Sequence, residues 1–404
     1  MPADRPRVVV AGGGVAGLEA CLALRSFLGD EQLRIDLLCA EPRFEYRPLA
    51  VLEPFGGAPT WSMELDAFAA DQGAQPVHDA LRAIDPDRRL AIPAHTRPIP
   101  YDALLVCIGA RPVRAIPGAI TFRGARDADA VRAALAAVGP GERTTIAFAA
   151  PLGAFWTLPL YELAILTAAR LHTRTRRARI VLATPEGAPL DAFGAQASAV
   201  VRQLLDVHGI EFRGGVRPVA ADAGELELDD GERIRTDAVI ALAGVRGRHI
   251  DGLPHDADGF VVVDEHGRVA GLDGVYAAGD MTSFPLKQGG LAAQQADAAA
   301  EAILAGLGVP LVPRPFEGIL RGVLYTDREP AYLRAPTGTT APAPQTYSMW
   351  WPPSKIAGRH LAPYLTVRAG APRAPEVRPR AGIFPVSVDV RAVASALAGE
   401  VPPG

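Results

Sequence analysis

The sequence feature that most constrains the fold is a glycine loop near the start of the chain. Gly12, Gly14 and Gly17 have the spacing G-x-G-x-x-G, between an apolar run at 7–11 and a helix predicted over 15–28. In such a loop the first glycine permits a tight turn, the second lets the backbone approach a pyrophosphate, and the third lets the helix pack closely on the strand. The loop therefore predicts a dinucleotide with its phosphates at the helix N-terminus.

The residues around this loop complete a βαβ unit. A second apolar strand is predicted over 33–39, and Glu41 follows it, where a carboxylate can accept hydrogen bonds from an adenosine ribose. Val15 and Ala16 lie at the helix N-terminus that faces the phosphates. Because strand, loop, helix, strand and acid occur in this order, an ordinary glycine turn is the weaker interpretation.

A short motif far along the chain indicates which dinucleotide is bound. The apolar residues 275–278 are followed by Gly279 and Asp280. At the end of a strand, the Asp280 carboxylate can accept a hydrogen bond from a ribityl hydroxyl, and Gly279 lets the backbone come close. A plain Gly-Asp turn is the alternative, but the motif precedes a helix that begins with glycines. The two motifs together predict FAD.

The composition narrows the class of protein. The chain has 404 residues, 49% apolar and 21% charged, which fits a globular protein of two or three domains. Its net charge of −4 gives no electrostatic footprint for nucleic acid. Cys21, Cys39 and Cys107 lack metal-ligand spacing, so no metal site is predicted. Sparse cysteines, no signal-peptide pattern and no long uncharged apolar window lead us to expect a cytoplasmic protein.

A second βαβ pattern occupies the middle of the chain, without a second glycine loop. Strands are predicted over 144–149 and 179–184, with a helix over 159–171 between them. Where a nicotinamide nucleotide would need glycines, the chain has Pro151, which removes a backbone N–H that could meet a phosphate. We therefore interpret this region as a degenerate NAD-type domain, and whether NAD(P)H binds there stays open.

A third cluster lies at the start of the glycine-led helix. Lys287, Gln288 and Gly289 would place the positive end of the helix dipole near the N1/O2 edge of a flavin, where it would stabilise the anionic reduced ring. Lys287 could add its own charge there or contact an acceptor. The alternative is a solvated lysine at a helix end, and the two interpretations are about equally favoured.

These motifs resemble the FAD-dependent pyridine nucleotide-disulfide oxidoreductase superfamily, and within it the sulfide:quinone oxidoreductases and type II NADH dehydrogenases. The resemblance rests also on 44–49, which looks like the stretch that covers the flavin, on 101–110, and on the turn at 116–118. The segment 284–292 is most similar to the sulfide:quinone side. The likeness extends over about 5–365 and is far more specific for FAD than for a substrate.

The resemblance completes the set of predicted site residues. The FAD-binding residues are expected to be Gly12, Gly14, Val15, Ala16, Gly17, Glu41, Pro48, Gly109, Ala110, Gly279, Asp280, Lys287, Gln288 and Gly289. The expected catalytic residues are Lys287 and Glu162, the latter as a proton acceptor, although an acid in a first helical turn is also simply favoured by the helix dipole. Lys355, with the tryptophans just before it, either lines a quinone-like pocket or packs in a small core.

The cysteines set the chain apart from this family. Sulfide:quinone enzymes carry sulfur between redox cysteines, at least two of them outside the first flavin unit, whereas every cysteine of this chain lies within its first 107 residues. Each is best interpreted as a small buried apolar residue. Cysteine-based sulfide oxidation is therefore not expected, and disulfide reductase chemistry is excluded on the same ground.

The predicted fold is α/β, with two Rossmann-like domains, the first discontinuous, and a small C-terminal domain. The predicted domains are 1–125 with 250–314, 126–249, and 315–404. The predicted function is an FAD-dependent oxidoreductase that transfers two electrons from a small-molecule donor to a quinone-like acceptor without a cysteine redox centre. The alternatives are an NAD(P)H dehydrogenase with an atypical nucleotide loop and a non-catalytic flavin-binding scaffold. Peripheral contact with a membrane and the oligomeric state stay open.

Overall fold

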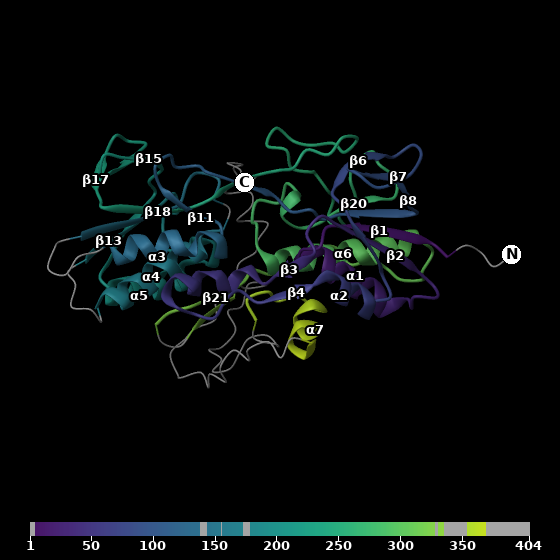
Figure 1. Ribbon diagram of the computed structural model, residues 1–404, viewed down its shortest axis with the longest axis horizontal. Helices are drawn as coiled ribbons and strands as arrows, with labels where there is room; N and C mark the ends of the chain where they lie inside the picture. The colour runs from purple at the N-terminus through teal and green to yellow at the C-terminus, as the bar shows by residue number, and fades with distance from the viewer. Residues whose placement is uncertain are drawn as a thin grey trace, which may run out of the picture.

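A five-stranded parallel sheet forms the core of the first lobe (Figure 1). The structure is a computed structural model, and it describes residues 5–137, 144–154, 156–172, 178–327, 330–334 and 354–368. In spatial order the strands of this sheet are β20 (Val275–Ala277), β9 (Ala103–Val106), β1 (Arg7–Ala11), β2 (Arg34–Cys39) and β5 (Gln75–His78). All neighbours run parallel, so the carboxyl ends of all five strands meet at one edge.

Both faces of this sheet are covered because its strands alternate their side chains between two apolar clusters. Val8 and Val10 pack under the helices, whereas Val9 and Ala11 pack against the opposite layer. The helical layer contains α1 (Val15–Phe27), α2 (Leu65–Asp71), α6 (Gly289–Gly306) and α7 (Leu361–Arg368) (Figure 1). The opposite layer contains β6 (Leu81–Asp85), β7 (Leu90–Pro93) and β8 (Ile99–Pro100). The sheet is buried on both sides, as a parallel sheet requires.

The second lobe repeats this architecture. Its parallel sheet has the order β11 (Ile120–Phe122), β18 (Ala238–Leu242), β12 (Thr144–Ala149), β13 (Ala178–Thr184) and β14 (Ile210–Gly214). Its helices are α3 (Ala128–Ala136), α4 (Leu158–His172) and α5 (Ala195–Val207). A small antiparallel sheet of β15 (Pro218–Asp222), β16 (Glu225–Leu228) and β17 (Arg233–Arg235) lies over the other face.

The chain passes between the lobes along a two-stranded antiparallel ribbon. It leaves the first lobe through β10 (Arg111–Val113) and returns through β19 (Gly244–Arg246), with Val113 opposite Gly244. The other elements are β3 (Arg43–Glu45), β4 (Ser62–Glu64), β21 (Arg321–Leu324), β22 (Ala331–Arg334) and the short helices η1 (Arg47–Phe55), η2 (Ala125–Asp127), η3 (Asp191–Phe193) and η4 (Gly279–Met281).

The predicted α/β fold with two Rossmann-like sheets is confirmed. β20 joins β9 of the first sheet, so the chain does return to the first lobe after the second one. The predicted domain boundaries stay predictions, and β11 already belongs to the second sheet although it precedes residue 126. Lys355 is described, whereas the tryptophans just before it lie outside the described residues. Within the described ranges, no helix is long and apolar enough to span a membrane.

Candidate functional site

The two motifs that predict a flavin meet at the carboxyl edge of the first sheet. β9 lies between β1 and β20, with Val106 opposite both Ala11 and Ala277. The loops that follow these strands therefore share one edge. Gly279 touches the glycine loop directly, because a Cβ on Gly279 would lie 3.1 Å from the Cβ of Ala16. The glycine loop and the Gly279-Asp280 motif therefore lie side by side.

At two glycines of the loop, Gly12 and Gly17, there is no space for a Cβ, whereas at Gly14 there is. A Cβ on Gly17 would lie 1.8 Å from the carbonyl oxygen of Gly12, and a Cβ on Gly12 would lie 2.3 Å from the carbonyl oxygen of Cys107. Gly12 also has a φ of +129°, a conformation that favours glycine. Among the described residues, by contrast, no atom lies within 4 Å of where a Cβ on Gly14 would be. This open side fits the predicted approach of a pyrophosphate to the backbone.

Several other predicted residues line the same edge. Gly109 has a φ of +68°, and no described atom lies within 4 Å of the position of its Cβ. Ala110 follows it directly, and Glu41 is exposed just beyond the end of β2. Asp280 is half-buried in η4, and within the described part of the chain no group donates a hydrogen bond to its carboxylate. A half-buried carboxylate without a donor fits the predicted ribityl hydroxyl.

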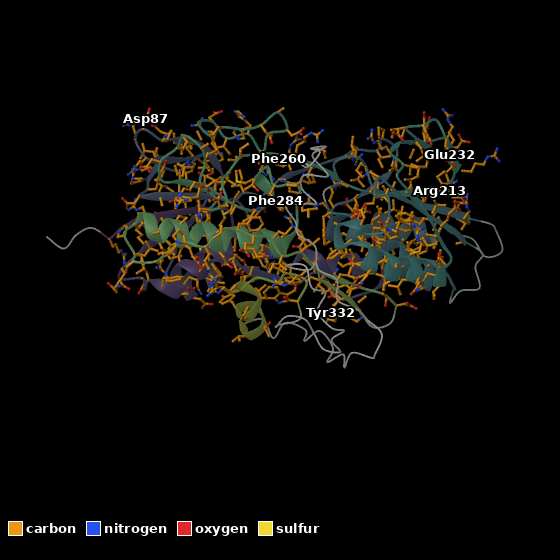
Figure 2. The ribbon with its side chains drawn as sticks, turned by 180° about the vertical axis from the view of Figure 1, so that it is seen from behind. Asp87, Arg213, Glu232, Phe260, Phe284 and Tyr332 are labelled. Atoms are coloured by element: carbon orange, nitrogen blue, oxygen red, sulfur yellow. The ribbon has the colours of Figure 1, made fainter. Side chains whose placement is uncertain are left out.

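Lys287 is buried, so its interpretation as a solvated lysine at a helix end is wrong. Its Nζ donates to the carbonyl oxygens of Thr282, at 2.5 Å, and Phe284, at 2.7 Å. It also lies 4.0 Å from the ring centroid of Phe260, and Figure 2 shows Phe260 and Phe284 close together near the middle of the molecule. Burial lowers the pKa of Lys287 to about 8, against the opposing effect of Asp280. Lys287 therefore fixes the loop that leads from Asp280 into α6.

We expect Lys287→Met to lower the free energy of unfolding by about 2–4 kcal/mol, because hydrogen bonds from a charged donor are lost. The deficit should grow with pH. Since the pKa of Lys287 is about 8 in the folded protein and about 10.4 in an unfolded chain, the unfolded state binds more protons between these values, and only the wild type gains stability there. Urea unfolding at pH 8 and pH 10 measures both effects. A deficit that does not change with pH would contradict the assignment.

The N-terminus of α6 is capped from within the chain. The Oε1 of Gln288 accepts a hydrogen bond from the Leu291 N–H at 2.9 Å, and its Nε2 donates to the carbonyl oxygen of Arg321 at 3.0 Å. Both polar atoms of the Gln288 amide are therefore already hydrogen-bonded within the protein. A Cβ on Gly289 would lie 3.2 Å from the Cγ1 of Ile356, so Gly289 permits close packing of a C-terminal segment. The FAD contacts predicted for Gln288 and Gly289 stay predictions.

Glu162 is fully buried in an ion pair, and the structure corrects its predicted place in a first helical turn. α4 begins at Leu158, which puts Glu162 in the second turn. Its Oε1 accepts from the Lys355 Nζ at 2.5 Å and from the Tyr325 N–H at 2.8 Å. Its Oε2 is buried with no hydrogen-bond partner among the described residues. Burial raises the pKa of Glu162, and the Lys355 ammonium opposes that rise.

Lys355 joins this pair to the stretch predicted to cover the flavin. Its side chain is 7% exposed, and its Nζ also donates to the carbonyl oxygen of Pro48 at 3.3 Å. The same Nζ lies 4.2 Å from the ring centroid of Tyr325. Desolvation lowers the pKa of Lys355, while Glu162 raises it. One buried ammonium thus ties together the helix α4, the short helix η1 and the C-terminal segment.

The three cysteines are free and buried, which confirms their interpretation as small apolar residues. The Cys107 Sγ lies 3.2 Å from the carbonyl oxygen of Ala11, directly under the glycine loop. Burial raises the pKa of Cys21 to about 12 and that of Cys39 to about 11. These thiols are therefore protonated at neutral pH, and a protonated thiol is a poor nucleophile.

Glu186 is the counterpart of Glu41 in the second lobe, and it is not among the residues predicted from the sequence. Glu186 stands just beyond the end of β13, as Glu41 stands just beyond the end of β2. Its carboxylate accepts hydrogen bonds from the hydroxyls of Tyr161 at 2.7 Å, Thr157 at 2.8 Å and Thr184 at 3.1 Å. Burial raises its pKa to about 7, although the hydroxyl donors oppose the rise. Its position could have identified it in the sequence, because an acid follows the second strand of both βαβ units.

Comparisons with known proteins agree with this architecture. The family model described as pyridine nucleotide-disulphide oxidoreductase matches residues 6–302. An NADH dehydrogenase-like protein from Mycobacterium tuberculosis is 28% identical over 292 residues, which cover 69% of this chain and 73% of that protein. The ferredoxin reductase component of a chlorobenzene dioxygenase from Cupriavidus sp. is 28% identical over 336 residues, 76% of each chain. The sulfide:quinone oxidoreductase from Aquifex aeolicus has a similar fold, with a TM-score of 0.75 at 20% identity, covering 82% of this chain and 83% of that one.

Proposed function

The chain belongs to the pyridine nucleotide-disulphide oxidoreductase family, and from this premise we propose that it passes two electrons from a small donor to a quinone-like acceptor without a cysteine redox centre. It is an FAD-dependent oxidoreductase, which sets the scaffold alternative aside. When bound, FAD supplies the two-electron carrier. The residues proposed to hold it are the open glycines Gly14 and Gly109, the acids Glu41 and Asp280, and the helix start at Val15.

The hydrogen bonding of Glu186 is the observation that favours a donor other than a nicotinamide nucleotide. In a dinucleotide site, the acid after the second strand accepts hydrogen bonds from a ribose. Three hydroxyls of the protein itself already donate to the Glu186 carboxylate, and one of them belongs to the fully buried Tyr161. Pro151 has no N–H for a phosphate, and Leu152 beside it is 66% exposed. These features argue against a nicotinamide nucleotide in the second lobe.

The proposed proton acceptor is the Glu162–Lys355 pair. Two-electron transfer releases or takes up protons, so a group that can exchange one near the reacting atoms assists it. The bare Oε2 of Glu162 offers a site for a proton, and the Lys355 ammonium controls how readily that proton binds. Lys287 is proposed to act beside Asp280 by holding positive charge at the start of α6.

An NAD(P)H dehydrogenase with an atypical nucleotide loop is the second candidate. It is favoured by the names of two relatives, an NADH dehydrogenase-like protein and a ferredoxin reductase component. Under this alternative a nicotinamide nucleotide would have to displace the hydroxyl of Tyr161 or Thr157 from Glu186.

The two candidates differ in what reduces the flavin. After anaerobic mixing of the FAD-loaded protein with NADH or NADPH, we expect no rapid loss of flavin absorbance, because three hydroxyls of the protein already donate to Glu186. After chemical reduction, we expect rapid reoxidation by a short-chain quinone. Glu186→Gln is the matched control and should alter neither result. Rapid bleaching by NADH that Glu186→Gln weakens would establish the alternative, and slow reoxidation by quinone would contradict the proposed acceptor.

A further inference from the structure

The segment 354–368, which we name the C-terminal strap, contacts two residues predicted to bind the flavin, Pro48 and Gly289. Ile356 packs on Gly289, which also faces Val15 of the glycine loop. The Ile356 N–H donates to the hydroxyl of Tyr46 at 3.1 Å. The strap therefore contacts the stretch 44–49 and the start of α6. Lys355, which pairs with Glu162, is part of it.

The far end of the strap is helix α7, which is fastened to the first lobe. The Tyr364 hydroxyl donates to the Asp71 carboxylate at 2.6 Å, and the Tyr364 ring meets the Phe68 ring edge-on with centroids 5.3 Å apart. Figure 1 shows α7 lying against α1 and α2. These contacts hold the helix at Tyr364, one turn beyond the point where the strap enters it.

The entry into α7 is fixed by a carboxylate from another helix. Glu19 of α1 is fully buried, and its two oxygens accept from the N–H groups of His360 at 2.7 Å and Leu361 at 2.8 Å. Gly358 makes this approach possible, because a Cβ there would lie 2.4 Å from the Glu19 Oε2. A carboxylate at a helix N-terminus satisfies free N–H groups and the helix dipole together.

A second carboxyl group lies against this anchor. A side-chain oxygen or nitrogen from each of Glu19, Asp297 and His360 lies within 4.8 Å of the others. The Oδ1 of Asp297 has no hydrogen-bond partner among the described residues and lies 3.8 Å from the His360 Nε2. Two neighbouring buried carboxyls do not both ionise readily. Burial, together with the negative charge of Glu19, raises the pKa of Asp297 to about 8.

The other charged groups around the pair favour a proton between the carboxyls over a metal ion. The Glu301 carboxylate is bound by Arg314, and the Arg359 Nη1 lies 3.7 Å from it. Arg359 opposes the rise in the pKa of Asp297, and it adds to the burial that lowers the pKa of His360. A metal ion at Glu19 would meet the positive charge of Arg359, whereas one proton on Asp297 neutralises that carboxylate and lets it donate a hydrogen bond to Glu19.

We propose that Glu19 and Asp297 are positioning residues for the flavin site, whose shared proton anchors the C-terminal strap and so holds Lys355 against Glu162. The inference rests on the proposed function only in placing the Glu162–Lys355 pair at the flavin. The protonated Asp297 donates to the Glu19 carboxylate, which in turn accepts from the strap. Loss of that proton leaves two adjacent anions, and the strap is released.

The sign of the pH dependence follows from linkage. A carboxyl whose pKa is raised to about 8 in the anchored state and is near 4 when exposed binds more protons while the strap is anchored. Anchoring therefore weakens as pH rises through that window and levels off above pH 8. The equilibrium constant for release rises by up to about ten-fold per pH unit. Asp297→Asn keeps a donor toward Glu19 and removes the titration, whereas Asp297→Ala removes both.

The experiment follows a fluorescent label on α7 in the FAD-loaded protein. Val367 is 86% exposed and the native cysteines are buried, so Val367→Cys can be labelled alone, with Val207→Cys on α5, where Val207 is 75% exposed, as the control site. Between pH 6 and 9, we expect the anisotropy at residue 367 to fall in the wild-type background. It should stay high with Asp297→Asn and low with Asp297→Ala, and residue 207 should report no change. A pH-independent anisotropy in the wild-type background overturns the proposal.

A second measurement distinguishes a positioning role of Asp297 from a purely structural one. The rate of flavin reoxidation by a short-chain quinone should lose its decline between pH 6 and pH 8 when Asp297→Asn is introduced, because Lys355 then stays in place. If quinone fails as acceptor but the anisotropy follows the expected pattern, the anchor stands and only the proposed function fails. A stoichiometric bound metal whose removal by EDTA releases the label at residue 367 would overturn the shared proton.

Discussion

Gly17→Ala should abolish FAD binding and destabilise the first lobe by more than about 4 kcal/mol, the range reserved for severe steric or packing defects. The added Cβ would stand 1.8 Å from the carbonyl oxygen of Gly12, and because this oxygen is backbone, no side-chain movement can relieve the clash. Helix α1 would have to withdraw from β1, and its N-terminus would leave the edge where phosphates are expected. Flavin content after purification and the urea midpoint measure the two effects.

Two further glycines serve as matched controls for this substitution. Gly14→Ala meets no described atom within 4 Å, so we expect a folded protein whose FAD affinity falls at least about ten-fold, since the methyl group enters the space proposed for the pyrophosphate. Gly187→Ala is equally unobstructed and lies away from that edge, so it should change neither property. Normal FAD affinity in Gly14→Ala would mean that the phosphates bind elsewhere.

Lys355→Met should cost about 3–5 kcal/mol of stability, because it leaves the buried Glu162 carboxylate without its cation. Glu162→Gln should cost a similar amount, since it leaves the Lys355 ammonium buried beside a neutral amide. The double variant should lose much less than the sum of the two, because neither charge then remains uncompensated. Urea unfolding of the four proteins gives the coupling free energy directly.

An exposed ion pair provides the contrast. Arg43 and Glu64 lie 2.8 Å apart with side chains 58% and 55% exposed, and such pairs contribute at most about 1 kcal/mol. The cycle of Arg43→Met and Glu64→Gln should therefore give a coupling near zero. If the buried cycle gave a coupling as small as the exposed one, Glu162 would be protonated in the folded protein and the ion pair would not exist as assigned.

Much of the fold could be predicted because its strands and helices carry local signals. The strand at 144–149 and the helix that begins at Gly289 lie where periodicity and glycine spacing placed them. The return of the chain to the first sheet followed from one motif, Gly279-Asp280, because both motifs must serve one ligand. These inferences depend on residues close in sequence or on a chemistry that requires two known partners.

The contacts made by the charged residues could not be predicted, because they depend on partners distant in sequence. Nothing near Glu162 indicates that Lys355 will meet it, and nothing near Lys287 indicates that the ring of Phe260 will lie against its ammonium. Glu19 looks like an ordinary residue of an amphipathic helix until His360 and Leu361 reach it. Burial of a charge is a tertiary property, and no local pattern encodes it.

The order of strands in the first sheet has a consequence for the growing polypeptide on the ribosome. β20 adds to β9 only after the whole of the second lobe has been synthesised, and Gly279 reaches Ala16 only then. Domains commonly fold as they emerge from the ribosome. The first lobe, however, keeps the edge of β9 unpaired while the second lobe is being synthesised. Because the proposed FAD-binding residues from Gly279 onward are made after the second lobe, we expect cofactor loading to be a late event in biogenesis.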